Sequence, residues 1–214
     1  MDTLEEVADA VAACTACPLH LSRRNTVPGE GTGRKGIMFV GEAPGRNEDE
    51  QGRPFVGAAG ELLTDLITRI LGLRRDDVFI TNVVKCRPPG NREPEPGEAA
   101  ACWRYLEAQV RILRPRIIVA LGRHAATALL AGPGSRPLSI GAVRGRPRTA
   151  RIAGVDVTVF PTLHPAAALY NRGQMDVLEE DFRRLAGMLG GGGTLDAFMH
   201  DRAIGPGEWT PRNA

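Results

Sequence analysis

Four short apolar runs separated by helical patterns constrain the fold of this 214-residue chain more than any other feature. Residues 37–40, 78–84, 117–121 and 155–160 have the length and branched apolar composition of buried strands. Leucine and isoleucine recur at helical spacing within 62–71, and Cys102, Leu106 and Val110 do so between the second and third runs. Strands that alternate with helices form a parallel sheet covered on both faces. We therefore expect a three-layer α/β/α fold with a central, mainly parallel four-stranded sheet.

Composition and further helical patterns suggest one domain. Residues 4–11, 123–130 and 177–189 have helical periodicity, and the chain is 43% hydrophobic and 24% charged, as globular proteins are. We expect residues 1–193 to form the domain and 194–214, beyond a glycine run, to be a loosely ordered C-terminal tail. The sequence has no apolar run long enough to cross a membrane and no signal segment, so we expect a soluble, cytoplasmic protein with no membrane contact.

The four cysteines fall into two groups, Cys14 with Cys17 and Cys86 with Cys102. Scattered core thiols are one alternative, whereas disulfides are disfavoured by the two-residue gap and the missing signal segment. Four thiolates suit either zinc or an iron–sulfur cluster. Structural zinc usually takes two short pairs. The fifteen residues between Cys86 and Cys102 therefore favour a bulkier cluster that spans two elements.

Functional loops of an open α/β sheet leave the carboxyl ends of the strands, and three such loops here, 41–57, 85–97 and 162–172, carry reactive side chains. The first contains the carboxylates Glu42 and Glu48 and several glycines, and it reaches Phe55 just before a helix. Glycines let the backbone approach a ligand, and a lone aromatic ring offers a stacking surface. The alternative is a solvated acidic loop with Phe55 in the core.

Two polar side chains follow other strands. Asn82 lies near the end of the second run, and its amide offers the donor and acceptor that the edge of a pyrimidine requires, although a turn cap is the alternative. His164 follows the fourth run, where it can stabilise developing charge or serve as a structural hydrogen-bonding group. The remaining histidines lack this context, and we interpret them as structural: His20, His124 and His200.

Four motifs in order resemble one family. GEAPG at 41–45, QGRPFVG at 51–57, TNVVKCRPPGNREP at 81–94 and HPAAALY at 164–170, with the four cysteines, are similar to family 4 uracil-DNA glycosylases over residues 10–185. The resemblance implies a monofunctional hydrolase that cleaves the N-glycosidic bond of flipped deoxyuridine and starts base excision repair. It also implies a prokaryotic protein at the nucleoid. A relative that is trapped covalently on DNA carries an extra basic insertion with a histidine, which 144–151 lacks, so we expect ordinary hydrolysis.

The resemblance also assigns roles to residues. It makes Cys14, Cys17, Cys86 and Cys102 the ligands of a structural 4Fe-4S cluster. It places His164 against the uracil carbonyl that gains negative charge. Ala43 occupies the position at which family 1 enzymes have an aspartate, so we assign the neighbouring carboxylate, Glu42, to orienting a water or stabilising the sugar cation. We assign Glu48 to the shape of the pocket, where it would exclude thymine by crowding its methyl group. The uracil pocket would then comprise Gly41, Ala43, Glu48, Phe55 and Asn82.

Arginines and one apolar side chain are the predicted DNA contacts. Five arginines and no acid lie between residues 131 and 151, and we expect some of them to grip phosphates, with a solvated basic loop as the alternative. Leu169 or Tyr170 would hold the gap that the flipped base leaves. The predicted DNA-binding residues are Arg87, Arg144, Arg146, Arg148, Leu169 and Arg172, with Arg136 and Arg151 as further candidates.

The expected partner is uracil-containing DNA, single- or double-stranded, with free uracil as product and the protein as a monomer. A contact with a sliding clamp stays open, since the end of the chain offers no convincing motif. Two other classes compete with the enzyme: a non-catalytic nucleic-acid-binding module with a structural metal, and an iron–sulfur electron carrier. The carrier ranks last because it gives His164 and the carboxylate-rich loop no purpose.

Overall fold

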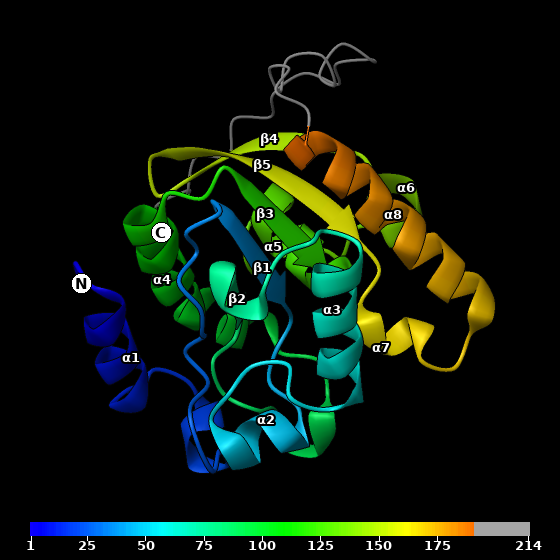
Figure 1. The fold of residues 1–214 in the computed structure, drawn as a ribbon. Helices are drawn as coiled ribbons and strands as arrows, with labels where there is room; N and C mark the ends of the chain where they lie inside the picture. Colours follow the sequence, from blue (N-terminus) through cyan, green and yellow to red (C-terminus); the bar gives the residue numbers. More distant parts are fainter. Residues whose placement is uncertain (191–214) are drawn as a thin grey trace.

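The computed structural model describes residues 1–190, which form a five-stranded sheet between two layers of helices (Figure 1). The strand order is β2-β1-β3-β5-β4, and every neighbouring pair is parallel except β4 with β5. The expected α/β/α architecture with a mainly parallel sheet is confirmed. The strands are β1 (Ile37–Gly41), β2 (Phe79–Asn82), β3 (Ile117–Leu121), β4 (Arg148–Ile152) and β5 (Val155–Thr162).

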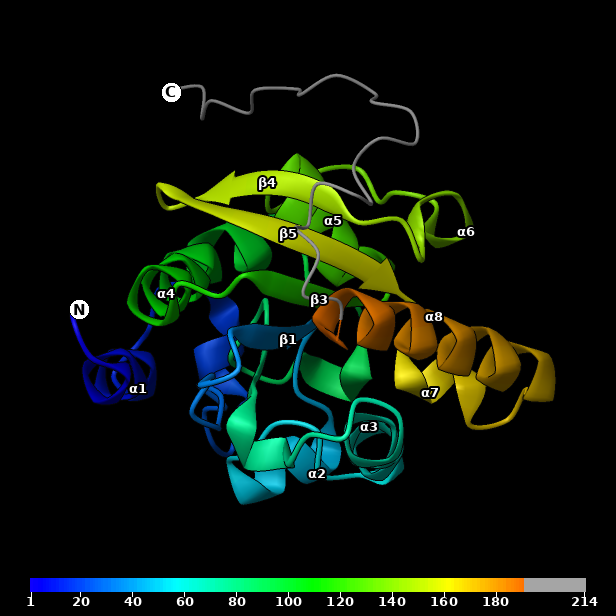
Figure 2. The ribbon, with the colours of Figure 1, turned by 45° about the horizontal axis from the view of Figure 1, so that its top comes forward.

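The helices divide between the two faces of the sheet, as Figure 2 shows in a second orientation. Helices α3 and α8 pack on one face, and α1, α4 and α5 on the other. The α-helices are α1 (Leu4–Ala12), α2 (Arg46–Gln51), α3 (Ala58–Arg69), α4 (Pro96–Leu113), α5 (Arg123–Ala131), α6 (Ile140–Val143), α7 (Pro165–Ala168) and α8 (Arg172–Gly190). Single 3₁₀ turns are η1 (Pro18–Leu21), η2 (Arg75–Asp77) and η3 (Pro89–Asn91).

The apolar runs are continuous because the central strands are covered on both faces. Along β1, Ile37 and Phe39 join the hydrophobic cluster under α3 and α8, while Met38 and Val40 join the one under α1, α4 and α5. Successive side chains of a strand point to opposite faces, so both sets must be apolar. All five residues of β1 and of β3 are buried.

The predicted count of four strands was too low, because the arginine-rich stretch before residue 152 has no apolar run that predicts a strand. Residues 148–152 form β4, an antiparallel edge strand whose side chains alternate between exposed and partly buried positions. Its arginines lie along an edge, where charged side chains discourage pairing with other chains. The hairpin to β5 turns at Ala153 and Gly154, both with positive φ, which suits a two-residue turn.

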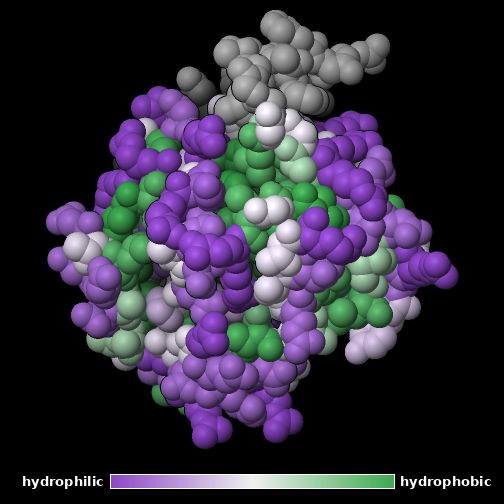
Figure 3. Space-filling view, viewed as in Figure 1, coloured by the Kyte–Doolittle hydropathy of each residue, from purple (hydrophilic) through white to green (hydrophobic). Residues whose placement is uncertain are grey.

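The three predicted loops meet at one edge of the sheet, because β1, β2, β3 and β5 run in the same direction. Two of these loops contain short helices that the periodicity did not reveal: α2 in the first loop and α7 in the third. Figure 3 shows a hydrophilic surface over α2, at the bottom of the view. No helix within residues 1–190 is long and apolar enough to span a membrane. The predicted tail, 194–214, lies outside the described residues.

Candidate active site

Gly41, Phe55 and Asn82 converge where β1 and β2 end. Gly41 pairs with Asn82 across the two strands, and Asn82 is only 2% exposed. A Cβ on Gly41 would lie 2.4 Å from the Oδ1 atom of Asn82 and 2.6 Å from the ring of Phe55. No side chain larger than hydrogen fits at position 41 without moving one of them. The structure thus brings three of the predicted pocket residues into contact.

Phe55 is held in an unusual backbone conformation. Its φ of 51° lies in the left-handed region, which non-glycine residues seldom adopt outside functional sites and tight turns. The next helix approaches so closely that a Cβ on Gly60 would lie 1.8 Å from the carbonyl oxygen of Phe55. The ring is 6% exposed and belongs to the core cluster of α3 and α8. It is therefore a core residue whose ring also lies beside Gly41 and His164.

Glu48 organises the loop around Phe55. One carboxylate oxygen accepts the backbone N–H groups of Val56 and Gly57 at 3.0 and 3.2 Å, and the other accepts that of Gly45 at 3.1 Å. A carboxylate with three backbone donors fixes both ends of the loop 45–57. Glu48 shapes the site through these backbone contacts.

His164 stacks on Phe55, with ring centroids 5.6 Å apart and an interplanar angle of 28°. It is the N-cap of α7, and its Nδ1 atom accepts the backbone N–H of Ala166 at 3.2 Å. Burial lowers the pKa of the imidazole to about 4, although Glu48 acts in the opposite direction. At neutral pH the ring is uncharged, and because Nδ1 is an acceptor its single proton lies on Nε2.

Glu42 belongs to a charged cluster that the sequence did not reveal. Its side chain is 29% exposed and lies 3.7 Å from Nε2 of His124, which is 3.2 Å from Glu93. Arg123 forms an ion pair with Glu93. Burial raises the pKa of the Glu42 carboxyl, and His124 opposes that shift while Glu93 adds to it. The sequence context of His124 indicates a structural residue, but His124 follows β3, so the strand-end rule that singles out His164 also applies to it.

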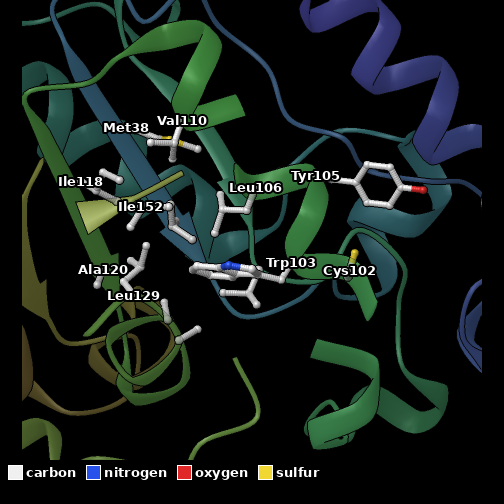
Figure 4. Close-up of a cluster of buried hydrophobic side chains, with 14 of the residues drawn as sticks. Met38, Cys102, Trp103, Tyr105, Leu106, Val110, Ile118, Ala120, Leu129 and Ile152 are labelled. Carbon is white, nitrogen blue, oxygen red and sulfur yellow. The ribbon is translucent and has the colours of Figure 1, made fainter. Parts of the chain in front are cut away.

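The four cysteines line one pocket. Cys14 and Cys17 follow α1, Cys86 follows β2, and Cys102 lies on α4. All four thiols are free. Figure 4 shows the sulfur of Cys102 on the side of α4 away from Trp103, whose ring packs among Leu106 and other core side chains. The fold thus brings the two cysteine pairs together, although 69 positions separate Cys17 from Cys86 in the chain.

The chemistry of the four thiols is compatible with an iron–sulfur cluster. Within residues 1–190 no three His, Cys, Asp or Glu side chains are close enough to hold a single ion, yet four thiols face one pocket. A 4Fe-4S cluster distributes its four cysteines over different irons, so their sulfurs need not meet at one point. N–H groups also point at the sulfurs: Arg23 at Cys86 (3.3 Å) and the backbone of Lys85 at Cys102 (3.3 Å).

The predicted DNA-binding arginines have different environments. Arg144 donates to the buried carboxylate of Asp181 at 2.7 and 3.0 Å, so it joins α8 to the end of α6. Arg148 lies half-buried in β4, and Arg87 donates to Asn91. In the described part of the chain, the exposed Arg146 and Arg172 form no ion pair.

The two wedge candidates also differ. Leu169 is partly buried at the end of α7, whereas the next residue, Tyr170, is 94% exposed. Both lie in the loop that directly follows His164 and α7.

Fold and site together define a member of a known superfamily. Residues 28–186 match the family model described as the uracil DNA glycosylase superfamily, and the chain belongs to it. Within that superfamily the chain is 54% identical to the type-4 uracil-DNA glycosylase of Saccharolobus solfataricus over 201 residues, 94% of this chain and 93% of the relative. It is 53% identical to the type-4 enzyme of Thermotoga maritima over 171 residues, 80% and 85% of the two chains.

A type-5 uracil-DNA glycosylase from Pyrobaculum aerophilum is 30% identical over 216 residues, 85% of this chain and 92% of the relative. The chain is thus a type-4 member of the superfamily, as the motifs predicted.

Proposed function

We propose that this protein hydrolyses the N-glycosidic bond of deoxyuridine flipped out of DNA and releases free uracil. The observation that carries the proposal is the stacking of the His164 imidazole beside Phe55 at the strand ends, where Asn82 also lies; burial lowers the pKa of this imidazole to about 4 and so favours its neutral form. A flat apolar ring, an amide and a hydrogen-bond donor are the groups that a pyrimidine leaving group requires.

Recognition of the base is assigned to the walls of this site. The ring of Phe55 stacks on uracil, and the amide of Asn82 presents a donor and an acceptor to its pairing edge. The backbone at Gly41 and Ala43 approaches the base closely because neither residue has a long side chain. Glu48 excludes thymine by fixing the loop that carries Phe55, so that the pocket cannot widen around a methyl group.

Departure of uracil is assigned to His164. Cleavage leaves negative charge on the base, and a donor aimed at the developing oxyanion stabilises the transition state by about 3–4 kcal/mol in comparable sites. The N–H at Nε2 is such a donor. Since the imidazole is neutral, it donates a hydrogen bond to the uracil oxygen and keeps its own proton. Uracil therefore leaves as an anion.

The sugar side is assigned to Glu42. The departing base leaves positive charge on the deoxyribose, which a carboxylate stabilises directly or through a water that it orients for attack. Nε2 of His124 lies 3.7 Å from that carboxylate. Burial raises the pKa of Glu42, so this carboxylate would lose its negative charge at a higher pH than an ordinary glutamate does.

We assign the four cysteines to a 4Fe-4S cluster. The residues that would hold it are Cys14, Cys17, Cys86 and Cys102, and the shared pocket and free thiols support this set. When bound, such a cluster cross-links the N-terminal segment, the segment after β2 and helix α4; it has no assigned part in bond cleavage.

DNA binding is assigned to the exposed cations and to the loop after α7. Arg146 and Arg172 are available to phosphates, whereas Arg144 is occupied by Asp181. Tyr170 is the stronger wedge candidate because its side chain is almost fully exposed and can enter the gap in the duplex. Flipping the base out of the stack costs only a few kcal/mol. Single- and double-stranded DNA are both proposed substrates, bound by a monomer.

The test is excision from a uracil-containing oligonucleotide in the presence of a chelator, with alkali used to cleave the abasic product. Wild-type protein is expected to cut at uracil, and His164→Ala and Asn82→Ala are expected to lower the excision rate far more than DNA binding. Binding without cutting would replace the enzyme with a nucleic-acid-binding module. A matched oligonucleotide with thymine at the same position is the control.

A further inference from the structure

Lys85 is a buried side chain that the proposed mechanism does not use. Its side chain is 0% exposed, and Nζ donates to three oxygens: Oγ1 of Thr81 at 2.6 Å, the carbonyl of Asn82 at 2.7 Å and Oε1 of Gln109 at 2.8 Å. Each ammonium hydrogen thus has one acceptor. No carboxylate in residues 1–190 forms an ion pair with it.

The choice of lysine at this position is informative, because the chain otherwise avoids it. Of its 27 basic side chains only Lys35 and Lys85 are lysines, and Lys35 is exposed. An ammonium is compact and has three donors, whereas a guanidinium is planar, wider and carries five. Three acceptors around one buried point suit the ammonium alone. Position 85 therefore has a lysine in a sequence whose basic residues are otherwise almost all arginines.

The acceptors of Lys85 form a closed network. The hydroxyl of Thr81 donates to the carbonyl of Pro28 at 2.8 Å, and Nε2 of Gln109 donates to the same oxygen at 2.7 Å. Lys85 completes the ring between Thr81 and Gln109. Helix α4, strand β2 and the segment before β1 are thereby fixed to each other by buried polar contacts, which hold a geometry more narrowly than apolar packing does.

The network is tied to the base-reading residue through its backbone. Asn82 is the last residue of β2, where the pairing of β1 with β2 ends at Gly41. The backbone carbonyl of Asn82 accepts a hydrogen bond from Lys85, which holds the peptide after Asn82 in place. The side-chain Oδ1 of Asn82 lies beside Gly41, next to the ring of Phe55. If this contact were lost, the end of β2 could shift, and the side chain of Asn82 would shift with its Cα.

We propose that Lys85 is a positioning residue for Asn82, and that it sets the orientation of the amide that reads uracil. The inference rests on the proposed role of Asn82 and goes beyond it. Lys85 does not touch the substrate; it acts through the carbonyl and the neighbouring Thr81. Its own backbone N–H points at the sulfur of Cys102, so the same residue borders the cysteine pocket.

The test is a double-mutant cycle on single-turnover excision, with enzyme in excess over a single-stranded uracil oligonucleotide. The variants are Lys85→Met, Asn82→Ala and the pair combined, with the exposed Lys35→Met as the matched control. Lys85→Met is expected to lower the excision rate at least tenfold. The combined variant is expected to be no slower than Asn82→Ala, because residues that act as one unit have non-additive effects. Lys35→Met is expected to match wild type.

Iron and sulfide content, visible absorbance and thermal midpoint are measured on every variant. They are expected to be unchanged in Lys85→Met, which separates positioning of Asn82 from damage to the cysteine pocket or to the fold. If Lys85→Met does not fold, Gln109→Leu removes one acceptor while keeping the ammonium, and the same cycle with Asn82→Ala is expected to be non-additive.

Two results would overturn the inference. One is a wild-type excision rate in a folded Lys85→Met, and the other is rate losses from Lys85 and Asn82 that multiply in the combined variant. If instead Asn82→Ala itself excises uracil as wild type does, the assigned role of Asn82 fails, and with it the basis of this inference. Failure of wild type to excise uracil is distinct from both and concerns the proposed function alone.

Discussion

His164 should remain a neutral donor well below the pH at which an ordinary histidine becomes charged. Its pKa of about 4 arises from burial, whereas a solvated imidazole titrates near 6.5. The sign follows from the direction of the shift. Since burial disfavours the cation, the neutral form persists as pH falls through the ordinary pKa and is lost only as pH approaches 4.

The magnitude of the effect is large at pH 5.5. An imidazole with an ordinary pKa would be neutral in about 9% of molecules there, while His164 would be neutral in about 97%. The His164 contribution to excision, about 10²–10³-fold for one donor to an oxyanion, should therefore be nearly the same at pH 5.5 as at 7.5. An unshifted histidine would change the occupancy of the neutral form by about tenfold over the same range.

The assay is single-turnover excision from a single-stranded uracil oligonucleotide between pH 5 and 8.5, for wild type and for His164→Ala. The ratio of the two rates is the quantity of interest. Glu42 also titrates, with a raised pKa, and lowers the rate as pH falls, but it does so in both proteins and cancels in the ratio. His124→Gln serves as a control, since it perturbs Glu42 and leaves His164 in place.

The expected ratio is flat across this range. A ratio that falls about tenfold between pH 7.5 and 5.5 would mean that His164 titrates as a solvated imidazole, and the assignment of a neutral Nε2 donor would then be wrong. NMR titration of ¹⁵N-labelled histidine gives an independent reading: His164 should keep the pattern of the neutral Nε2–H form at pH 5.5.

Three further outcomes are expected. Gly41→Ala should lower excision at least about a hundredfold, because a Cβ 2.4 Å from the Oδ1 atom of Asn82 displaces the amide or Phe55; near-normal rates in the excision assay would contradict the pocket geometry. Arg172→Ala should leave the thermal midpoint unchanged and reduce the slope of log affinity against log salt by about one. Arg144→Ala should instead destabilise the fold by about 3–5 kcal/mol, because it leaves the buried carboxylate of Asp181 without its ion-pair partner. DNA titrations at several salt concentrations and thermal unfolding distinguish the two variants. Purified protein should be brown with near-stoichiometric iron and sulfide, and a colourless protein with one zinc would exclude the cluster.

The order of the strands and helices could be predicted because hydrophobic periodicity is a local property. Continuous apolar runs such as 117–121 require burial on both faces, and that alone indicates a parallel, helix-covered sheet. The edge strand β4 escaped prediction because it has no apolar run: Arg148 and Arg151 are two of its five residues, and a local pattern does not separate such a strand from a solvated loop.

Candidate site residues followed from the rule that loops at the carboxyl ends of parallel strands meet. Phe55, Asn82 and His164 were selected in this way, and the structure brings them together. The roles of individual arginines could not be predicted, since Arg144 and Arg172 are identical in sequence terms and differ only in whether Asp181 lies beside them.

Sequence alone determined the residue types available at each strand end, the four thiols and the family they indicate. Tertiary structure decided what each group experiences. The protonation of His164, the contact of His124 with Glu42 and the three acceptors around Lys85 all depend on neighbours that are distant in the chain. Burial and electrostatic interaction act through space, so no local pattern of residues can specify them.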